Sequence, residues 1–314
     1  MDVKKIVLLN IFITSLLFSQ ELFYIKSPPQ LLIGQSETGF MQPKWSPDGT
    51  QIAFTSINYR GLWVADSSGN NIRQLSDEPA AGFDFRWSPS SDQIVTRVAR
   101  FENFLRFNAL ELLDITVRSK KMLTPFTRQL PGVPQWLNDG VVSYYDGQKL
   151  ASLQIKEGRT NKTGRILVFV KDGNIAVYKP GSDQIILQDP LKRDGYLNVV
   201  LSPDQKKIAF EIMGGNMYVM DITGTNIIDL GRGYRPQWSP DSRFILYMLT
   251  EDNGHNYTAS DIYVIDIFNK EKQNITLTDD KIEMNPNWSP DGRTIVYDEF
   301  IEGNIYKLEL EINQ

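Results

Sequence analysis

Few side chains in this sequence could carry nucleophilic, redox or metal chemistry. The 314 residues include no cysteine and a single histidine, His255. Without cysteine, the chain cannot form disulfides, thiolate nucleophiles, or Cys-ligated zinc and iron–sulfur sites. One imidazole cannot supply the usual multi-histidine metal site, and it offers one candidate base. For His255 we favour a solvated loop position over either role, and we expect no metal site and no cofactor.

The sequence motifs of several enzyme classes are also missing. There is no G-x-S-x-G nucleophile elbow, no G-x-x-x-x-G-K-[ST] phosphate loop and no G-x-G-x-x-G dinucleotide motif. Glycosidase chemistry needs only two suitably spaced carboxylates, so it stays open. The net charge of −5 argues against a nucleic-acid partner, because such proteins normally carry a basic domain or stripe.

Aspartates recur at regular places and raise the question of a cation site. Six of them lie in short turns that would share one face of a repetitive fold: Asp48, Asp92, Asp139, Asp204, Asp241 and Asp291. A calcium site is one interpretation, since Ca²⁺ takes carboxylate oxygens. We favour the other, in which each aspartate hydrogen-bonds the backbone of its own turn.

These aspartates belong to a repeated cassette that defines the architecture. A Pro-x-Trp-Ser-Pro-Asp-Gly pattern, with variations, occupies 43–49, 85–89, 134–140, 200–204, 236–241 and 286–292. Five of the six tryptophans share one slot, and Leu201 fills it in the fourth copy. Such periodicity is typical of repeat folds. We interpret the tryptophans as packing between repeats.

Strand-forming runs follow each cassette. Residues such as 51–54 and 207–210 are apolar and β-branched, and a second half-repeat follows at 62–75, 110–123, 175–187, 217–230 and 262–277. Four short antiparallel strands per unit predict an all-β, six-bladed β-propeller. The interval from Trp136 to Leu201 is too long for one unit and holds candidate strands at 149–155 and 166–170. A seventh blade at 166–187, lacking a tryptophan, is the alternative; we prefer six, because each half of the interval would be short.

Both ends of the chain should meet in the last blade. The final unit stops near Leu310 and lacks an outer strand, while Gln30–Ile33 precedes the first cassette as an unassigned strand. Pairing the two ends removes an open sheet edge, which would otherwise invite aggregation. The sequence therefore predicts an N-terminal strand that closes the last blade.

The repeated cassette followed by runs such as Ile-Ala-Phe and Tyr-Val-Met-Asp resembles the PD40 (WD40-like) repeats of the TolB propeller family. The resemblance covers about residues 30–314. It implies an exported six-bladed propeller that works as a protein-interaction platform in the bacterial envelope. TolB itself carries an α/β domain before its propeller. The first cassette here begins at Pro43, so we do not expect that domain in this chain.

The N-terminus reads as a targeting segment. Lys4 and Lys5 precede an apolar run from Ile6 to Phe18, which covers roughly 20 Å as a helix and is shorter than a bilayer core of about 30 Å. This pattern predicts a signal peptide over 1–20, with the propeller at 21–314. We expect a periplasmic or secreted monomer with no membrane span after signal removal.

Two segments resemble binding surfaces more than packing. Residues 97–108 interleave arginine with phenylalanine, and residues 250–260 contain His255 and Tyr257. Arginine and aromatic side chains are enriched at interface hot spots. With the connections between repeats, the candidate partner-binding residues are Arg97, Arg100, Phe101, Phe104, Arg106, Phe107, Arg128, Arg232, Tyr234, Arg235, His255 and Tyr257. For 97–108 itself, an ordinary long hairpin with arginines lying along it is the interpretation that we favour.

These features predict a non-catalytic, exported scaffold that binds an envelope or periplasmic protein, and no enzyme. The alternative is a propeller-fold glycan lyase or hydrolase. Lyases of that architecture generally rely on several histidines around a metal, and this chain has one histidine.

Overall fold

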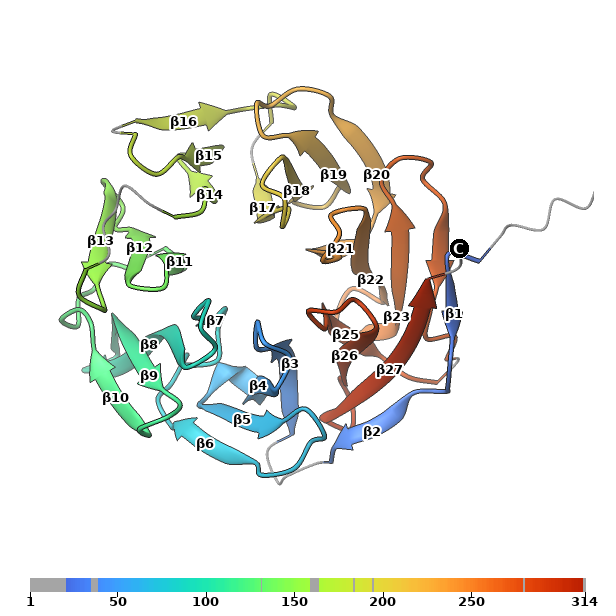
Figure 1. The fold of residues 1–314 in the computed structure, drawn as a ribbon, viewed down its shortest axis with the longest axis horizontal. Coiled ribbons are helices and arrows are strands. Elements are labelled where there is room, and N and C mark those ends of the chain that lie inside the picture. The colour runs from blue at the N-terminus through green and yellow to red at the C-terminus, as the bar shows by residue number, and fades with distance from the viewer. Residues whose placement is uncertain are drawn as a thin grey trace, which may run out of the picture.

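Seven antiparallel sheets stand around a common centre in the computed structural model (Figure 1). The structure describes residues 21–34, 39–130, 132–158, 164–182, 184–193, 195–278 and 280–312, so the expected signal peptide lies outside the described residues. The chain folds as an all-β propeller. In the described ranges, no helix is long and apolar enough to cross a membrane.

The first two blades have four strands each, as the repeat predicts. Blade 1 comprises β3 (Phe40–Trp45), β4 (Gln51–Ser56), β5 (Leu62–Asp66) and β6 (Arg73–Ser76), with a short 3-10 turn η1 (Ile57–Tyr59) after β4. Blade 2 comprises β7 (Arg86–Trp87), β8 (Gln93–Glu102), β9 (Leu105–Asp114) and β10 (Ser119–Met122). In each blade, the cassette tryptophan ends the inner strand and the Ser-Pro turn leads into the second.

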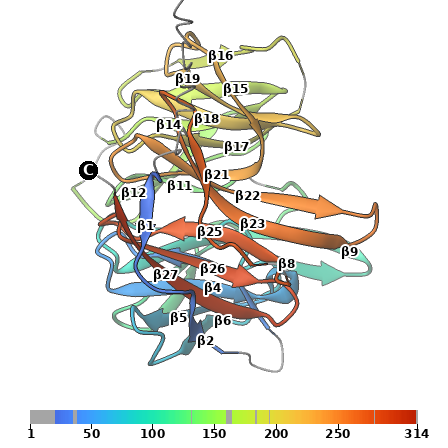
Figure 2. The same cartoon turned by 90° about the vertical axis from the view of Figure 1, so that its right-hand side faces the viewer.

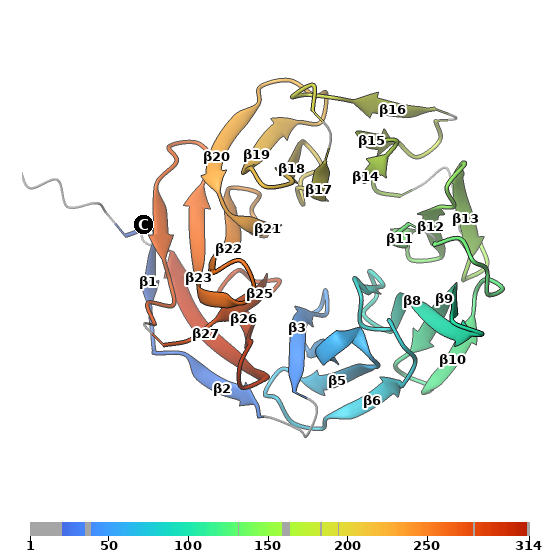
Figure 3. The same cartoon turned by 180° about the vertical axis from the view of Figure 1, so that it is seen from behind.

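The interval that was too long for one unit contains two blades. Blade 3 comprises β11 (Gln135–Asn138), β12 (Val141–Tyr145) and β13 (Leu150–Gln154), and blade 4 comprises β14 (Leu167–Lys171), β15 (Asn174–Tyr178) and β16 (Ile185–Gln188). They lie side by side when the ring is seen from behind (Figure 3). The preferred count of six blades is therefore wrong, and the alternative of seven is confirmed. The interval looked too short for two blades because four strands per blade were assumed, whereas both described sheets have three.

The remaining blades return to the longer pattern. Blade 5 comprises β17 (Tyr196–Leu201), β18 (Lys207–Ile212), β19 (Asn216–Asp221) and β20 (Ile228–Arg232); blade 6 comprises β21 (Tyr234–Trp238), β22 (Phe244–Asp252), β23 (Tyr257–Asp266) and β24 (Lys272–Asn274). Blade 7 takes β25 (Glu283–Trp288), β26 (Thr294–Glu299) and β27 (Asn304–Ile312) from the end of the chain.

The predicted closure by the N-terminus is confirmed and is longer than expected. Strand β2 (Gln30–Ile33) pairs with the first half of β27, and β1 (Phe23–Ile25) pairs with the second half, from Leu310 to Ile312. Both strands run along the outer side of blade 7 (Figure 1). The edge of the last blade is thus covered along its length by the beginning of the chain.

Three of the five cassette tryptophans hydrogen-bond to the preceding blade, in agreement with their interpretation as packing residues between repeats. The indole N–H of Trp87 donates to the carbonyl of Lys44 at 3.1 Å, and that of Trp136 donates to the carbonyl of Arg86 at 3.1 Å. Trp238 repeats the contact with the carbonyl of Val200 at 3.2 Å. In each case the acceptor directly precedes the cassette slot of the blade before, so one contact spaces successive blades.

Four of the six turn aspartates accept a hydrogen bond from the backbone of their own turn, as the favoured interpretation predicts; Asp92 and Asp139 have other partners. Asp48 accepts hydrogen bonds from the Ser46 hydroxyl at 2.6 Å and from the Thr50 backbone N–H at 3.0 Å. Asp204 and Asp291 have the same arrangement with their neighbouring serines and backbone. These carboxylates therefore serve as turn acceptors.

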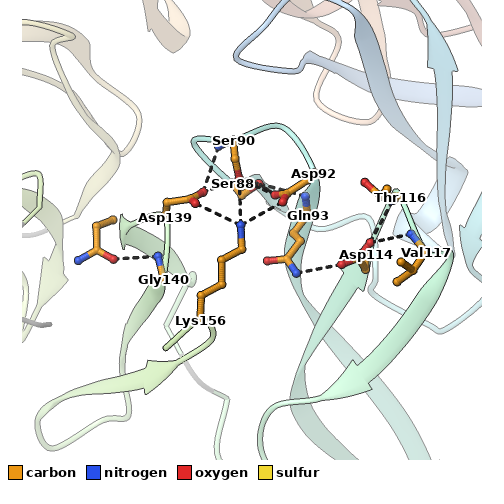
Figure 4. Close-up of polar contacts among 11 residues, drawn as sticks. Ser88, Ser90, Asp92, Gln93, Asp114, Thr116, Val117, Asp139, Gly140 and Lys156 are labelled. Carbon is orange, nitrogen blue, oxygen red and sulfur yellow. Dashed lines mark hydrogen bonds and ion pairs between the residues drawn. The ribbon is translucent and has the colours of Figure 1, made fainter. Parts of the chain in front are cut away.

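Two of the aspartates also take part in a contact between blades 2 and 3 (Figure 4). The Lys156 ammonium, just after β13, lies 3.0 Å from Asp92 and 3.1 Å from Asp139. Ser90 contacts both carboxylates from the intervening turn. Burial acts to lower the pKa of Lys156, but the hydrogen bonds and charges of the two aspartates outweigh burial and raise this pKa. The lysine thereby neutralises two carboxylates that would otherwise repel.

We expect Lys156→Met to lower the free energy of unfolding by about 1 kcal/mol, since networks of charges exceed isolated surface pairs. Urea unfolding followed by fluorescence measures this change. The matched control is Lys206→Met, which removes a lysine that is 80% exposed and 3.9 Å from Asp204. Equal effects of the two substitutions would contradict a bridging role for Lys156.

Candidate functional site

The two predicted binding segments are extended hairpins on one side of the ring. Strands β8 and β9 stay paired out to Glu102 and Leu105, and β22 and β23 stay paired out to Asp252 and Tyr257. Both hairpins reach beyond the other turns toward the same side (Figure 2). We call this side, formed by the turns between second and third strands, the hairpin face. Residues 97–108 are thus mainly strand, in the long hairpin that the sequence offered as an interpretation of this segment.

Three of the predicted residues of blade 2 lie at or near the tip of the β8–β9 hairpin. Phe101 and Phe104 lie at the tip, and Phe104 is fully exposed. Arg100 lies 4.4 Å from the ring centre of Phe126 and pairs with Glu102 at 3.2 Å. These contacts hold the Arg100 side chain on the hairpin, close to its tip.

The other predicted residues occupy several places. Arg106 bonds to Asn108 at 2.8 Å, and Phe107 lies on the Arg100 side of the same hairpin. Arg128 is exposed in the connection to blade 3, and Arg232 donates to the Tyr234 hydroxyl at 3.4 Å. His255 is exposed in the turn of the β22–β23 hairpin. Tyr257 follows it and contacts Phe300 of blade 7 edge-on, with ring centres 5.7 Å apart.

Apolar side chains line the hairpin face in addition to the two hairpins. The turns of blades 1, 5 and 7 expose Ile57, Met213, Phe300 and Ile301. None of these was predicted, because each is a single apolar residue in an unremarkable turn. Together with Phe101, Phe104 and Tyr257, they spread exposed apolar groups around one face.

Two predicted arginines lie away from the hairpin tips: Arg235 lines a pocket at the centre of the ring, and Arg97 is buried. This central pocket, of about 100 Å³, is lined by Gln42, Pro43, Lys44, Phe83, Asp84, Asn198, Arg235, Gln237, Asn285, Pro286 and Asn287. Arg97 is buried behind it, with its guanidinium 4.8 Å from the Phe83 ring centre. The lining comes from the inner strands of blades 1, 5, 6 and 7 and from the segment before β7.

Repeated β-bulges direct side chains into the central pocket. The register of the inner strand shifts in blades 1, 5, 6 and 7, and a residue with positive φ lies at each shift: Gln42, Asn198, Arg235 and Asn285. Asp84 has the same position and a φ of 58° in blade 2. A bulge bends its strand and re-aims one side chain. All five residues lie three positions before the cassette slot.

An ion cluster lies on one wall of the central pocket. Asp84 pairs with Arg86 at 2.7 Å and with Lys44 at 3.2 Å. Burial opposes ionisation, but the charges of Arg86 and Lys44 hold the pKa of Asp84 well below its usual range. Burial and the charge of Arg86 lower the pKa of Lys44 to about 8, although Asp84 opposes that shift. Positive charge therefore outweighs the single carboxylate of this wall.

Two buried carboxylates support the bulges from behind. Asp298 accepts a hydrogen bond from the Gln42 backbone N–H at 2.8 Å and another from the Asn285 amide at 2.9 Å. Glu211 accepts one from Asn198 at 2.9 Å and contacts the backbone N–H of Arg235. Burial raises the pKa of both, that of Asp298 to about 7. These contacts join blade 7 to blade 1 and blade 5 to blade 6.

The raised pKa of Asp298 predicts how the free energy of unfolding depends on pH. Its folded pKa of about 7 lies above the ordinary aspartate value, so the folded state binds more protons than the unfolded state between these values. The contribution of Asp298 to the free energy of unfolding is therefore largest at low pH. It falls as the pH rises toward 7, by up to about 1.4 kcal/mol per pH unit. Urea unfolding between about pH 4 and pH 7 measures the slope, which we expect Asp298→Asn to flatten.

Glu311→Gln, a change at an exposed carboxylate on β27, is the control for this series. It should leave the slope of the unmodified protein in place. A slope unchanged by Asp298→Asn would contradict the raised pKa.

Sequence reasoning missed most of the central pocket, although a signal was present. The residue before the cassette slot changes from copy to copy, as Lys44, Arg86, Gln135, Val200, Gln237 and Asn287. The position three before the slot changes in the same way. Residues that recur in every copy of a repeat pack in the same way in each blade, whereas polar positions that vary between copies can contribute to a binding site. Bulges and ring closure were needed to bring them together.

Comparisons with known proteins find similar solved structures but no family. No family model matches the sequence, and no curated protein matches it. Similar solved structures include an oligogalacturonate lyase in complex with manganese, with 13% identity, a TM-score of 0.48, and 88% of this chain and 79% of that chain covered. TolB from Acinetobacter baumannii is similar with 17% identity and a TM-score of 0.49, covering 90% of this chain and 66% of TolB. At these values neither protein's activity transfers to this chain.

Proposed function

We propose that this protein is an exported, non-catalytic scaffold of the bacterial envelope that binds a protein partner on its hairpin face. The observation that carries the proposal is the projection of two long hairpins, tipped by Phe101, Phe104 and Tyr257, from the same side of the ring. Aromatic side chains beside arginines are enriched among the residues that dominate binding energy. Export rests on the apolar segment from Ile6 to Phe18.

The rigidity of the ring supports this role. Indole N–H groups donate and a buried carboxylate accepts hydrogen bonds between successive blades, so the hairpins are held by a preformed frame. Binding a partner then orders fewer groups of this protein, and so costs less conformational entropy, than binding on a mobile surface. Exposed apolar turns of other blades extend the contact area around the two hairpins.

The test compares capture of envelope proteins by three forms of the full chain. The double variant Phe101→Ser/Phe104→Ser removes the tip of one hairpin, and Phe268→Ser removes an equally exposed phenylalanine from a turn between third and fourth strands, on the opposite face. A partner retained by the unmodified chain and by Phe268→Ser, and bound at least about tenfold more weakly by the double variant, is the expected result.

Two results would overturn the proposal. Equal binding of the partner by the double variant would place the contact elsewhere. Turnover in a screen of oligosaccharides, which is the outcome for a glycan lyase or hydrolase, would show that the protein is an enzyme.

A further inference from the structure

Cations from three blades converge on the central pocket. Lys44 comes from blade 1, Arg86 from blade 2 and Arg235 from blade 6, and the charges of Arg86 and Arg235 both act on Lys44. Asp84 is the carboxylate in direct contact with Lys44 and Arg86. Water still reaches them, because 22% of the Lys44 side chain and 35% of the Asp84 side chain are exposed. Such a cluster suits an incoming anion.

The two carboxylates behind the pocket do not cancel this charge fully. Glu211 and Asp298 lie near Arg235, and both accept hydrogen bonds from the bulged strands. Burial raises the pKa of both groups, that of Asp298 to about 7, so Asp298 carries less negative charge near neutral pH than an exposed carboxylate. Positive charge is therefore in excess at the pocket itself.

Donors remain for a ligand in the described part of the pocket. The Lys44 ammonium has three N–H groups and contacts two acceptors, Asp84 at 3.2 Å and the Phe85 carbonyl at 3.3 Å. Arg235 directs one guanidinium nitrogen to Asn285, which leaves other N–H groups of its five. Hydrogen bonds between ionised partners are among the strongest that proteins make.

We propose that the central pocket binds a side-chain carboxylate of an acidic segment of the protein partner, held by Lys44 and Arg235. This inference rests on the proposed function, because the segment belongs to the protein that docks on the hairpin face. The lining residues lie along the inner strands, which start at the connections from the preceding blade, and those connections end on the hairpin face. A docked partner can therefore reach it.

The size and lining of the pocket favour a peptide over a free polyanion. A volume of about 100 Å³ holds a carboxylate with a few attached carbons and little more. The amides of Gln42, Asn198 and Asn287 offer both donors and acceptors, which match the N–H and C=O groups of a peptide backbone. Phe83 and the two prolines supply apolar walls for the side-chain stem.

The experiment is isothermal titration of the full chain with a capped tetraglutamate peptide, a capped tetraglutamine peptide, and succinate, at low ionic strength. We expect the glutamate peptide to bind at least about tenfold more tightly than the glutamine peptide, with affinity that falls as salt is added. Binding should also weaken as the pH rises past about 8, where Lys44 loses its charge. Succinate that binds as tightly as the peptide would overturn the assignment to a peptide.

Variants test the two cations. Lys44→Met keeps an unbranched apolar side chain but removes the ammonium, which lies 4.7 Å from the Phe85 ring centre. It should weaken binding about tenfold, as should Arg235→Gln, whereas Lys44→Arg should retain binding. Lys206→Met, a change at an exposed lysine on the opposite face, is the control. Circular dichroism shows that each variant is folded. Unchanged binding in folded Lys44→Met and Arg235→Gln would overturn the proposal.

The two proposals fail separately. The variant Phe101→Ser/Phe104→Ser should still bind the glutamate peptide, because its changes lie at the hairpin tip. If the double variant loses the partner but the unmodified chain binds no glutamate peptide, the proposed function stands and the carboxylate site alone is overturned.

Discussion

Replacing Phe23 with alanine is expected to lower the free energy of unfolding by about 3–5 kcal/mol, the usual cost for a buried phenylalanine. Phe23 is 1% exposed, and its ring lies 4.9 Å from that of Phe244 and 5.6 Å from that of Trp288. Its backbone bonds twice to the Gln273 side chain of blade 6, with both distances 2.9 Å. The substitution therefore leaves a cavity where the beginning of the chain joins blades 6 and 7.

The neighbouring Tyr24 provides a matched control. It lies on the same short strand with its side chain on the opposite face and 57% exposed, so Tyr24→Ala should change stability by less than about 0.5 kcal/mol. Urea unfolding followed by tryptophan fluorescence measures both variants. A small effect of Phe23→Ala, comparable with that of Tyr24→Ala, would show that the N-terminal strands do not close the ring in solution.

Replacing Trp238 with alanine is expected to cost a similar amount, about 3–5 kcal/mol. The indole is 8% exposed and packs with Met217, Ile245 and Tyr247 in the cluster shared by blades 5 and 6. It also donates to the carbonyl of Val200 at 3.2 Å, which fixes the spacing of the two blades. Loss of both the ring and the donor should separate them locally.

A more conservative pair isolates the hydrogen bond. Trp238→Phe keeps most of the apolar surface and leaves the Val200 carbonyl without its donor, at a cost of about 1–3 kcal/mol beyond the packing change. Trp45→Phe is the comparison, because the indole nitrogen of Trp45 has no hydrogen-bond partner in the described structure. The same denaturation assay applies. Equal losses in the two variants would mean that the indole N–H of Trp238 contributes nothing.

The two proposed contacts place different demands on a partner. The hairpin face offers apolar and aromatic groups at the tips of β8–β9 and β22–β23, which favour area and shape. The central pocket offers fixed charge, which favours one class of side chain. An interface that combines an apolar rim of this kind with a single buried ion pair gains selectivity, because a neutral side chain in the pocket would leave Lys44 without its new partner.

The blade count shows the limit of reasoning from spacing. The repeat correctly placed strands at 149–155 and 166–170, and these are β13 and β14. Their division between two blades depended on whether each blade kept four strands, which length alone could not reveal. In the described residues, the sheets of blades 3 and 4 have three strands each, and only the structure shows this.

The binding residues divide in the same way. Alternating arginine and phenylalanine correctly marked an exposed hairpin, yet the pattern gave no sign that Arg97 turns inward while Phe101 and Phe104 remain outside. Arg235 was grouped with surface residues because it follows a connection between repeats. A bulge with positive φ at Arg235 directs it instead to the central pocket.

The sequence by itself determined the repeating blade, the slot filled by five tryptophans and Leu201, and the closure of blade 7 by the strand at Gln30–Ile33. These are local or periodic properties, because each copy carries the same turn and packing residues. Only the tertiary structure decided the seven blades and the central pocket. Lys44, Asp84 and Arg235 are far apart in the chain, and closing the ring is the step that brings their charges together.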